Sequence, residues 1–361
     1  MIPIADPQIG TAERENVEAV FDSGHLADGD VVRRFESAFS EYCGASHGVA
    51  TTNGTTALHA GLEAVEIGRG DTVLTTPFSF IATANAARIV GADVGFVDID
   101  PATYNLDVDR LRERLQDGED VDAVIAVHLY GLPADLAPLR ELATKYDFAL
   151  IEDAAQAHGA TYEGERVGSF GDLACFSFYP TKNMTTGEGG MITTDRADVA
   201  RRARRFIDHG RTEGYEHATV GHNFRMTNVA AAVGNAQLDR LQTNTTRRRH
   251  NADVLTAGLE GTPVRTPLTP PDRTHVFHQY TIRYEDRDGL RSHLEDRGVG
   301  TGIYYPIPID DQPAYEGVGS RSPVARRAAR EVLSLPVHPG VSEGDLEYIA
   351  DAVADYTGRE A

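Results

Sequence analysis

The chain has 361 residues, a formal net charge of −21 and an apolar content of 41%. Such a negative surface would repel phosphate, which argues against a nucleic-acid partner. No apolar stretch is long enough to span a membrane, and the first ten residues lack the pattern of a signal peptide. We therefore expect a cytoplasmic protein with one large domain and a smaller companion. Cys43 and Cys175 are too few and too far apart for a disulfide scaffold or a thiolate metal cluster.

Lysine is almost absent: Lys145 and Lys182 stand against 32 arginines. An acidic, lysine-poor composition suggests adaptation to high intracellular salt, where screening reduces the repulsion between like charges. We therefore predict a halophilic host. Maximal stability in dilute buffer, with loss of structure in molar salt, would contradict this prediction.

The first two-thirds of the chain alternates between short apolar strands and amphipathic helices. In chain order the elements are helix 55–65, strand 72–76, helix 83–90, strand 93–98, helix 107–115, strand 123–128, helix 136–146 and strand 148–153. Near-continuous apolar strands suit a parallel sheet that is covered on both faces. The pattern predicts an α/β fold with a mostly parallel sheet between layers of helices.

The last third has a different organisation. A helical pattern runs from residue 227 to about 259, interrupted by a polar patch at 243–246, and the proline-rich stretch 262–271 follows. Residues 275–284, 289–297 and a final helix after Ser342 predict a small α+β domain. We place the change of domain near residue 245, which gives a large domain 1–245 and a small domain 246–361.

Three segments carry candidate chemistry, and the first is Asn53-Gly54-Thr55-Thr56. It joins the end of a strand to the start of a helix, where backbone N–H groups favour an anion such as phosphate. The same residues are also compatible with an ordinary turn that ends in a helix-capping residue. The second is Asp153, at the carboxyl end of strand 148–153, where open α/β sheets place their ligands. It could hold a protonated ring nitrogen, ligate a metal or cap a turn.

The third segment surrounds Lys182 and extends from Ser177 to Gly190. It is too irregular for an amphipathic helix and too rich in glycine for a buried strand. A lysine five residues after a serine suggests an aldehyde cofactor that is bound both covalently and through its phosphate. A P-loop is excluded because no Gly-Lys-Ser/Thr occurs. Lys145 lies in the helical stretch 136–146 and fits a solvated surface charge.

Together the three segments supply the attachments that pyridoxal phosphate needs. A helix start near Gly54 would hold the phosphate, Asp153 would keep the pyridine nitrogen protonated, and Lys182 would form the imine. The sequence also resembles the DegT/StrS family of nucleotide-sugar aminotransferases, the perosamine synthases among them, which have the type I fold of pyridoxal phosphate enzymes. Five motifs carry this resemblance along nearly the whole chain: residues 76–85, 152–159, 177–190, 221–227 and 305–308.

The resemblance implies a role for each matching residue. Lys182 would form the imine and later move the proton, with Asp153 on the pyridine nitrogen and Gln156 near the 3-hydroxyl group. The residues implied to complete the cofactor site are Gly54, Thr55 and Ser177 on the phosphate, Phe80 stacked on the ring, and Asn223 reaching the phosphate from the neighbouring subunit. Asn223 thus implies a homodimer with shared active sites. Arg225, implied to meet the carboxylate of the amino donor, and Tyr305 are the substrate candidates.

The implied reaction moves an amino group from glutamate, through pyridoxamine phosphate, to a keto group of a nucleoside-diphosphate sugar, for amino-sugar and polysaccharide biosynthesis. Related sugar dehydratases carry histidine at the position of Lys182, which speaks against that activity. A cofactor-binding regulator without turnover and a nucleotide-binding module without enzymatic activity are further alternatives. His128 and His158 are interpreted as packing or hydrogen-bonding residues.

One segment departs from the family pattern. After Pro308 the family often has Leu-His, whereas this chain has Ile309-Asp310-Asp311-Gln312-Pro313. The change leaves the cofactor residues intact and puts substrate contacts of the small domain in doubt. Asp310 is open to a second interpretation, in which it only adds to the acidic surface.

Overall fold

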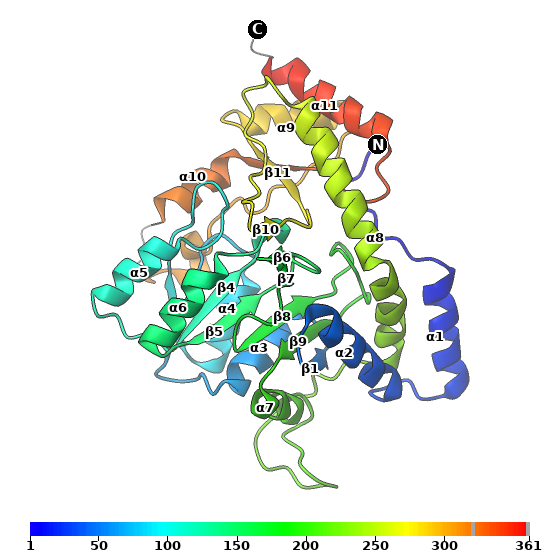
Figure 1. Ribbon diagram of the computed structural model, residues 1–361, viewed down its shortest axis with the longest axis vertical. Coiled ribbons are helices and arrows are strands. Elements are labelled where there is room, and N and C mark those ends of the chain that lie inside the picture. Colours follow the sequence, from blue (N-terminus) through cyan, green and yellow to red (C-terminus); the bar gives the residue numbers. More distant parts are fainter. Residues whose placement is uncertain (319–321, 359–361) are drawn as a thin grey trace.

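The computed structural model describes residues 1–318 and 322–358, and a seven-stranded mixed sheet forms its centre (Figure 1). The strands, in spatial order, are β1 (His47–Thr51), β9 (Gly190–Thr194), β8 (Leu173–Ser177), β5 (Ala149–Asp153), β4 (Ala123–Val127), β2 (Thr72–Thr75) and β3 (Asp93–Phe96). Neighbours from β8 to β3 run parallel, whereas β9 is antiparallel to both β1 and β8. This confirms the predicted α/β fold with a mostly parallel sheet.

Helices cover both faces of this sheet because successive strand residues point to opposite sides. Val73 and Ile151 pack among α3, α4 and α7 on one face. Their neighbours Leu74 and Leu150 pack against α5 and α6 on the other face, which α2 and α8 complete. The helices are α1 (Thr11–Ser23), α2 (Asp30–Cys43), α3 (Gly54–Ala64), α4 (Ala82–Val90), α5 (Val108–Gln116), α6 (Leu136–Tyr146), α7 (Ala197–Ile207) and α8 (Asn228–Gly258).

The predicted interruption of the long helix at 243–246 is wrong, because α8 continues through this polar patch. Thr245 is buried inside the helix, and the Thr246 hydroxyl donates to the Gln242 carbonyl at 2.9 Å. A threonine that bonds back to the preceding turn is compatible with a helix. The helix begins at Asn228 and is capped by Thr227, whose hydroxyl accepts from the Ala230 N–H at 3.2 Å.

In the C-terminal part, a two-stranded antiparallel sheet and two of the helices pack with the end of α8 around their own apolar cluster. These elements are β11 (Tyr280–Arg283), α9 (Arg287–Asp296), β12 (Val332–Leu335) and α11 (Glu343–Thr357). The domain boundary near residue 245 stays a prediction. Several contacts cross it: α8 is continuous, Ile2 bridges Val299, and β10 (Arg273–Thr274) pairs with β6 (Thr161–Tyr162) of the β6–β7 (Glu165–Arg166) hairpin.

A segment of the C-terminal part returns over the end of the central sheet. The Ile309 N–H donates to the Pro77 carbonyl at 2.8 Å. Asp98 caps the first turn of α10 (Pro323–Glu331), since its carboxylate accepts from the Val324 and Ala325 N–H groups at 2.9 and 3.0 Å. These contacts hold residues 303–312 close to the carboxyl ends of the strands.

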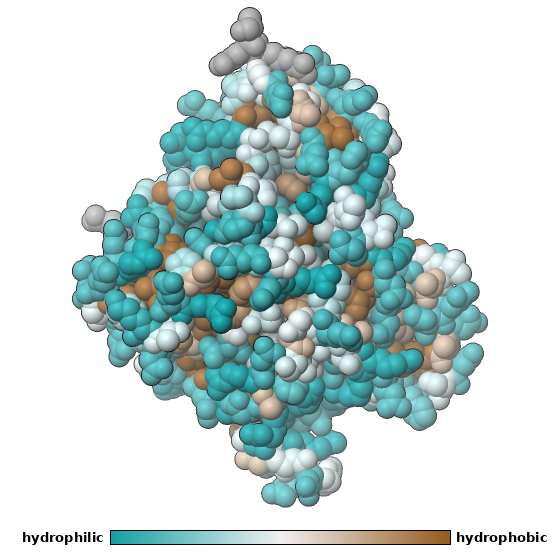
Figure 2. All heavy atoms as spheres, in the orientation of Figure 1, coloured by the Kyte–Doolittle hydropathy of each residue, from teal (hydrophilic) through white to brown (hydrophobic). Residues whose placement is uncertain are grey.

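The surface seen in Figure 2 is mostly hydrophilic, with small scattered apolar areas. Within the described residues, no helix is long and apolar enough to cross a membrane.

Candidate active site

The start of α3 meets the end of β8 in a cradle formed by Gly54 and Ser177. A Cβ atom on Gly54 would lie 2.7 Å from the Ser177 Cβ, so only glycine fits without a shift. Asn53 caps the helix by accepting from the Thr56 N–H at 2.9 Å. The Gly54 and Thr55 N–H groups belong to the first turn, where no helix carbonyl can receive them. The capping turn and the anion cradle are therefore both present, in adjacent residues.

Asp153 ends β5 with its carboxylate held from two directions. Its Oδ2 accepts from the Thr83 hydroxyl at 2.7 Å, and its Oδ1 accepts from the Ala155 N–H at 3.2 Å. The Thr83 hydroxyl also lies 3.0 Å from the Ser79 hydroxyl. This chain of hydroxyls fixes the orientation of the carboxylate, which is almost fully buried. The sequence pattern does not single out Thr83, which starts a predicted helix one turn after the Ser79-Phe80 motif.

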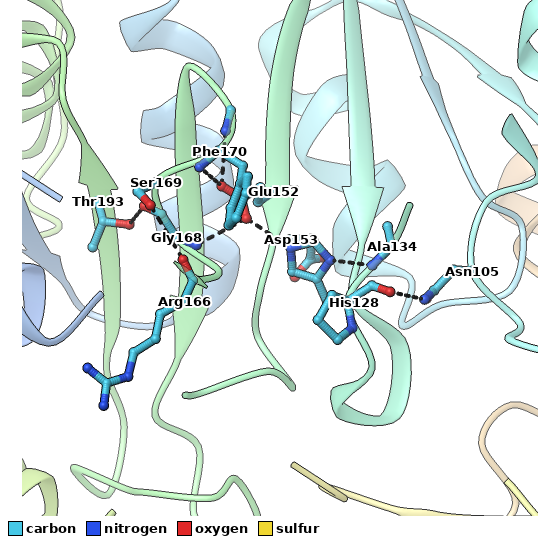
Figure 3. A network of polar contacts seen from close by, with 12 residues as sticks. Asn105, His128, Ala134, Glu152, Asp153, Arg166, Gly168, Ser169, Phe170 and Thr193 are labelled. Atoms are coloured by element: carbon cyan, nitrogen blue, oxygen red, sulfur yellow. Dashed lines mark hydrogen bonds and ion pairs between the residues drawn. The ribbon is translucent and has the colours of Figure 1, made fainter. Parts of the chain in front are cut away.

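Glu152, the neighbour of Asp153, points to the opposite side of the sheet and anchors the strand end (Figure 3). Its carboxylate accepts from the Gly168, Phe170 and Gly171 N–H groups at 2.9–3.1 Å. His128 Nε2 lies 3.0 Å from Glu152 Oε2. Because His128 Nδ1 accepts from the Ala134 N–H, Nε2 carries the proton and donates it.

These hydrogen bonds determine the protonation state of Glu152. Burial alone would raise the pKa of Glu152, but the bonds from His128 and the backbone outweigh it and leave the pKa below its usual range. Glu152 is therefore an anion whose hydrogen bonds are satisfied inside the core. His128 is a hydrogen-bonding residue, as the sequence interpretation held.

Gln156 and Tyr305 form a second fixed pair near Asp153. The Gln156 amide oxygen accepts from the Tyr130 N–H at 2.7 Å, so its NH₂ group faces the Tyr305 hydroxyl at 3.1 Å. Burial, helped by the charge of Asp153, raises the pKa of Tyr305 and keeps its hydroxyl neutral. Phe80 lies across from this pair, 6.2 Å from the Tyr305 ring centroid, with 57% of its surface exposed. Such an exposed aromatic face can receive a planar ligand.

Lys182 lies in the loop between β8 and β9, which is neither helix nor strand, as predicted. Its side chain is partly buried, and burial lowers the pKa of its amine to about 8, although the Asp153 carboxylate acts to raise it. His158 packs against Phe39, Phe176 and Phe178. Burial and the neighbouring Lys182 lower the pKa of His158 to about 3, so this histidine stays neutral.

Two predicted residues lie on the segment 223–225, whose backbone pairs with Thr51 and Thr52 at the end of β1. Arg225 Nη1 pairs with the Asp208 carboxylate, beside the backbone of Thr51. Asn223 is exposed on the same segment and bridges to Asp208 through its backbone.

Asp310 is not a surface charge, and that interpretation is wrong. Its side chain is 1% exposed and pairs with Arg326 at 3.1 Å. The pair holds the segment that carries Tyr305 against α10.

The residues gathered at the strand ends fit pyridoxal phosphate. Free N–H groups, the Ser177 hydroxyl and the absent side chain of Gly54 suit a phosphate. The fixed Asp153 anion suits a protonated pyridine nitrogen, and the exposed Phe80 suits a ring face. A lysine amine with a lowered pKa suits attack on an aldehyde. The protein thus offers a chemically suitable residue for each of the three parts of the cofactor, its phosphate, its ring and its aldehyde.

Comparison with known proteins agrees with this geometry. Residues 7–354 match the model of the DegT/DnrJ/EryC1/StrS aminotransferase family. The chain is 38% identical to the dTDP-3-amino-3,4,6-trideoxy-α-D-glucose transaminase of Streptomyces venezuelae, with 95% of this chain and 91% of the relative covered. It is 39% identical to a pleiotropic regulatory protein of Geobacillus stearothermophilus, with 94% and 93% covered.

Solved structures show the same relationship. A DegT/DnrJ/EryC1/StrS aminotransferase from Brucella abortus superposes with a TM-score of 0.93 at 33% identity, with 96% of each chain covered. The PLP form of Spr1654 from Streptococcus pneumoniae superposes with a TM-score of 0.92 at 27% identity, with 99% of this chain and 98% of that chain covered. The chain therefore belongs to the pyridoxal phosphate-dependent DegT/DnrJ/EryC1/StrS aminotransferase family.

Proposed function

We propose that this protein transfers an amino group from glutamate to a keto group of a nucleoside-diphosphate sugar. The observation that supports this most is the convergence of Lys182, Asp153 and the Gly54–Ser177 cradle from three separate strand ends. Similar proteins include transaminases of dTDP- and UDP-linked sugars. Their different nucleotides leave the nucleotide of this chain to be found by testing candidate ketosugars.

Lys182 is the proposed attachment point and proton carrier. Its pKa of about 8 leaves roughly one amine in ten neutral at pH 7, enough for the amine to attack an aldehyde and to exchange a proton near neutrality. When bound, pyridoxal phosphate supplies the electron-withdrawing ring that makes the proton on the amine-bearing carbon removable. Asp153, fixed by Thr83 and Ala155, would hold the ring nitrogen, while Gln156 would lie near the ring hydroxyl.

The phosphate and the ring face would be held by the other proposed residues. Gly54 and Thr55 would donate backbone N–H groups, and Ser177 its hydroxyl, which already lies 3.4 Å from the Tyr179 N–H. Phe80 would cover the ring. None of these residues has to move a proton, so their role is to position the group that does the chemistry.

A homodimer with shared sites is also proposed. Residues 208–222 form an extended arm that projects from the molecule beyond α7 (Figure 1), and Asn223 follows directly after it. Tyr215 and Val220 on this arm are about nine-tenths exposed, so the arm presents apolar side chains that a second subunit could cover. A mass in solution of twice the chain is expected by light scattering, and a monomer that retains full turnover would contradict the shared site.

Addition of glutamate to the purified holoenzyme tests the reaction itself. We expect the visible absorption of the lysine-bound cofactor to be replaced by the near-ultraviolet absorption of pyridoxamine phosphate, and 2-oxoglutarate to be released. No conversion with any amino acid would favour a regulator without turnover. The similar protein from Geobacillus stearothermophilus is named as a regulatory protein. Loss of a sugar hydroxyl group, in place of amine transfer, would favour a dehydratase.

A further inference from the structure

A small polar cavity of about 30 Å³ lies beside Lys182. Its walls come from the loop 180–185, the N-terminal segment 5–8 and the middle of α8. A water-sized group needs roughly 10–15 Å³ measured in this way, so the cavity holds about two such groups. That space suits the carboxylate and the amino group of an amino acid but not its side chain as well.

Arg248, from α8, brings an uncompensated positive charge to this cavity. It is 7% exposed, and its Nη1 donates to the Phe277 carbonyl at 3.1 Å. Its Nε has no hydrogen-bond partner among residues 1–318 and 322–358, and no carboxylate there forms an ion pair with the guanidinium, although Asp6 also lines the cavity. A buried charge without a partner is strongly unfavourable, so this arrangement points to an anionic ligand.

Asn183, beside Lys182 in the sequence, brings the complementary group to the same cavity. It is 5% exposed, and its NH₂ group donates to the Val276 carbonyl at 3.1 Å. This bond leaves Oδ1 as the free acceptor, and no partner for it is found among the described residues. An N–H donor from a ligand would satisfy this oxygen.

A cation that lacks its anion and an acceptor that lacks its donor therefore line one cavity together with Lys182. An α-amino acid carries the matching pair, a carboxylate and an amino group on one carbon. Arg225, implied by the resemblance for the carboxylate, is occupied by Asp208. We propose that Arg248 binds the α-carboxylate of the amino donor and that Asn183 accepts from its amino group. This assignment rests on the proposed aminotransferase function and adds to it the residues that bind the amino donor.

The test compares Arg248→Gln with Arg249→Gln, the exposed neighbour on the same helix. Both variants, loaded with pyridoxal phosphate, are titrated with glutamate by absorption and with the unreactive dicarboxylate glutarate by calorimetry. Loss of charge-assisted hydrogen bonds should weaken both ligands about tenfold to hundredfold in Arg248→Gln only. Conversion by an amine that lacks a carboxylate should be unchanged in both variants. Equal affinities for glutamate and glutarate in the two variants would overturn the proposal.

Two further measurements separate the remaining outcomes. If Arg248 binds an inorganic anion instead, chloride shifts the spectrum of the wild-type protein and of Arg249→Gln but not that of Arg248→Gln, while glutamate affinity is equal in all three. If Arg248→Gln does not bind its cofactor, a crystal structure of the wild-type holoenzyme soaked with glutarate tests the proposal instead. A carboxylate on Arg248 supports the proposal, and one on Arg225 overturns it. A wild-type protein that converts no amino acid overturns the aminotransferase function itself.

Discussion

Lys182→Arg is expected to abolish both covalent cofactor attachment and amino transfer, with a loss of turnover on the order of a thousandfold or more. Arginine keeps the positive charge and much of the length, but it stays protonated and cannot attack an aldehyde. The native amine, with its pKa lowered to about 8 by burial, can do so. Reduction with borohydride followed by peptide mass spectrometry locates the attachment, and single-turnover absorption measures the transfer.

Lys145→Arg is the matched control, because it changes the only other lysine of the chain in the same way. Lys145 is exposed on α6, and its amine lies 4.8 Å from the Tyr146 ring. An exposed cation–π contact contributes about 0.5–1 kcal/mol, and arginine preserves it. We expect wild-type attachment and turnover. A reduced adduct on Lys145, or attachment that survives Lys182→Arg, would show that the lysine was wrongly assigned.

Glu152→Ala is expected to lower the free energy of unfolding by about 3–5 kcal/mol, because a buried donor that loses its acceptor costs about 1–3 kcal/mol. The substitution leaves the His128 N–H and three backbone N–H groups without their acceptor. Denaturant unfolding at pH 7 measures the loss. Glu141→Ala, at an exposed glutamate on α6, is the control and should change the value by less than about 0.5 kcal/mol.

The same network gives stability a definite dependence on pH. The pKa of Glu152 is lower in the folded protein than in the unfolded chain. Its contribution is therefore complete above the unfolded pKa, about 4.3, and is lost as the pH falls through the folded value. The difference between wild type and Glu152→Ala should shrink below pH 4. A constant difference from pH 7 to pH 3 would mean that the carboxylate charge is not what stabilises the strand end.

The sequence was most informative where the role of a residue could be recognised from its neighbours in the chain. Lys182 stood out because glycines and a serine surround it, and the β-strands that end at Thr75 and Asp153 were recognised from their apolar runs. Residues whose role arises from contacts distant in the chain were not recognised. Thr83 contacts Asp153 across 70 positions, and Arg248 reaches the cavity from a run of three arginines, 247–249, in the long helix α8. The hydrophobic periodicity of a sequence indicates which face of a helix or strand a residue lies on. It does not indicate which residues, distant in the chain, pack against that face.

The polar patch in α8 shows a second limit. Threonine has a low helix propensity, so 243–246 read as an interruption. In the folded protein, burial of Thr245 and the bond from the Thr246 hydroxyl to the preceding turn outweigh that small preference. Asp310 was misjudged for a related reason, because its acidity matched the surface composition while its partner Arg326 lies 16 positions away.

The unbroken course of α8 has a mechanical consequence. A helix of 31 residues is about 46 Å long, and this one packs on the central sheet at its start and on the C-terminal part at its end. If the two parts move when a ligand enters, α8 would transmit the motion as a tilting lever, while the connecting segments 259–272 and 303–308 would absorb the change of backbone angles. Arg248 lies on that lever, so the side chain proposed to receive the donor would be displaced by the same movement.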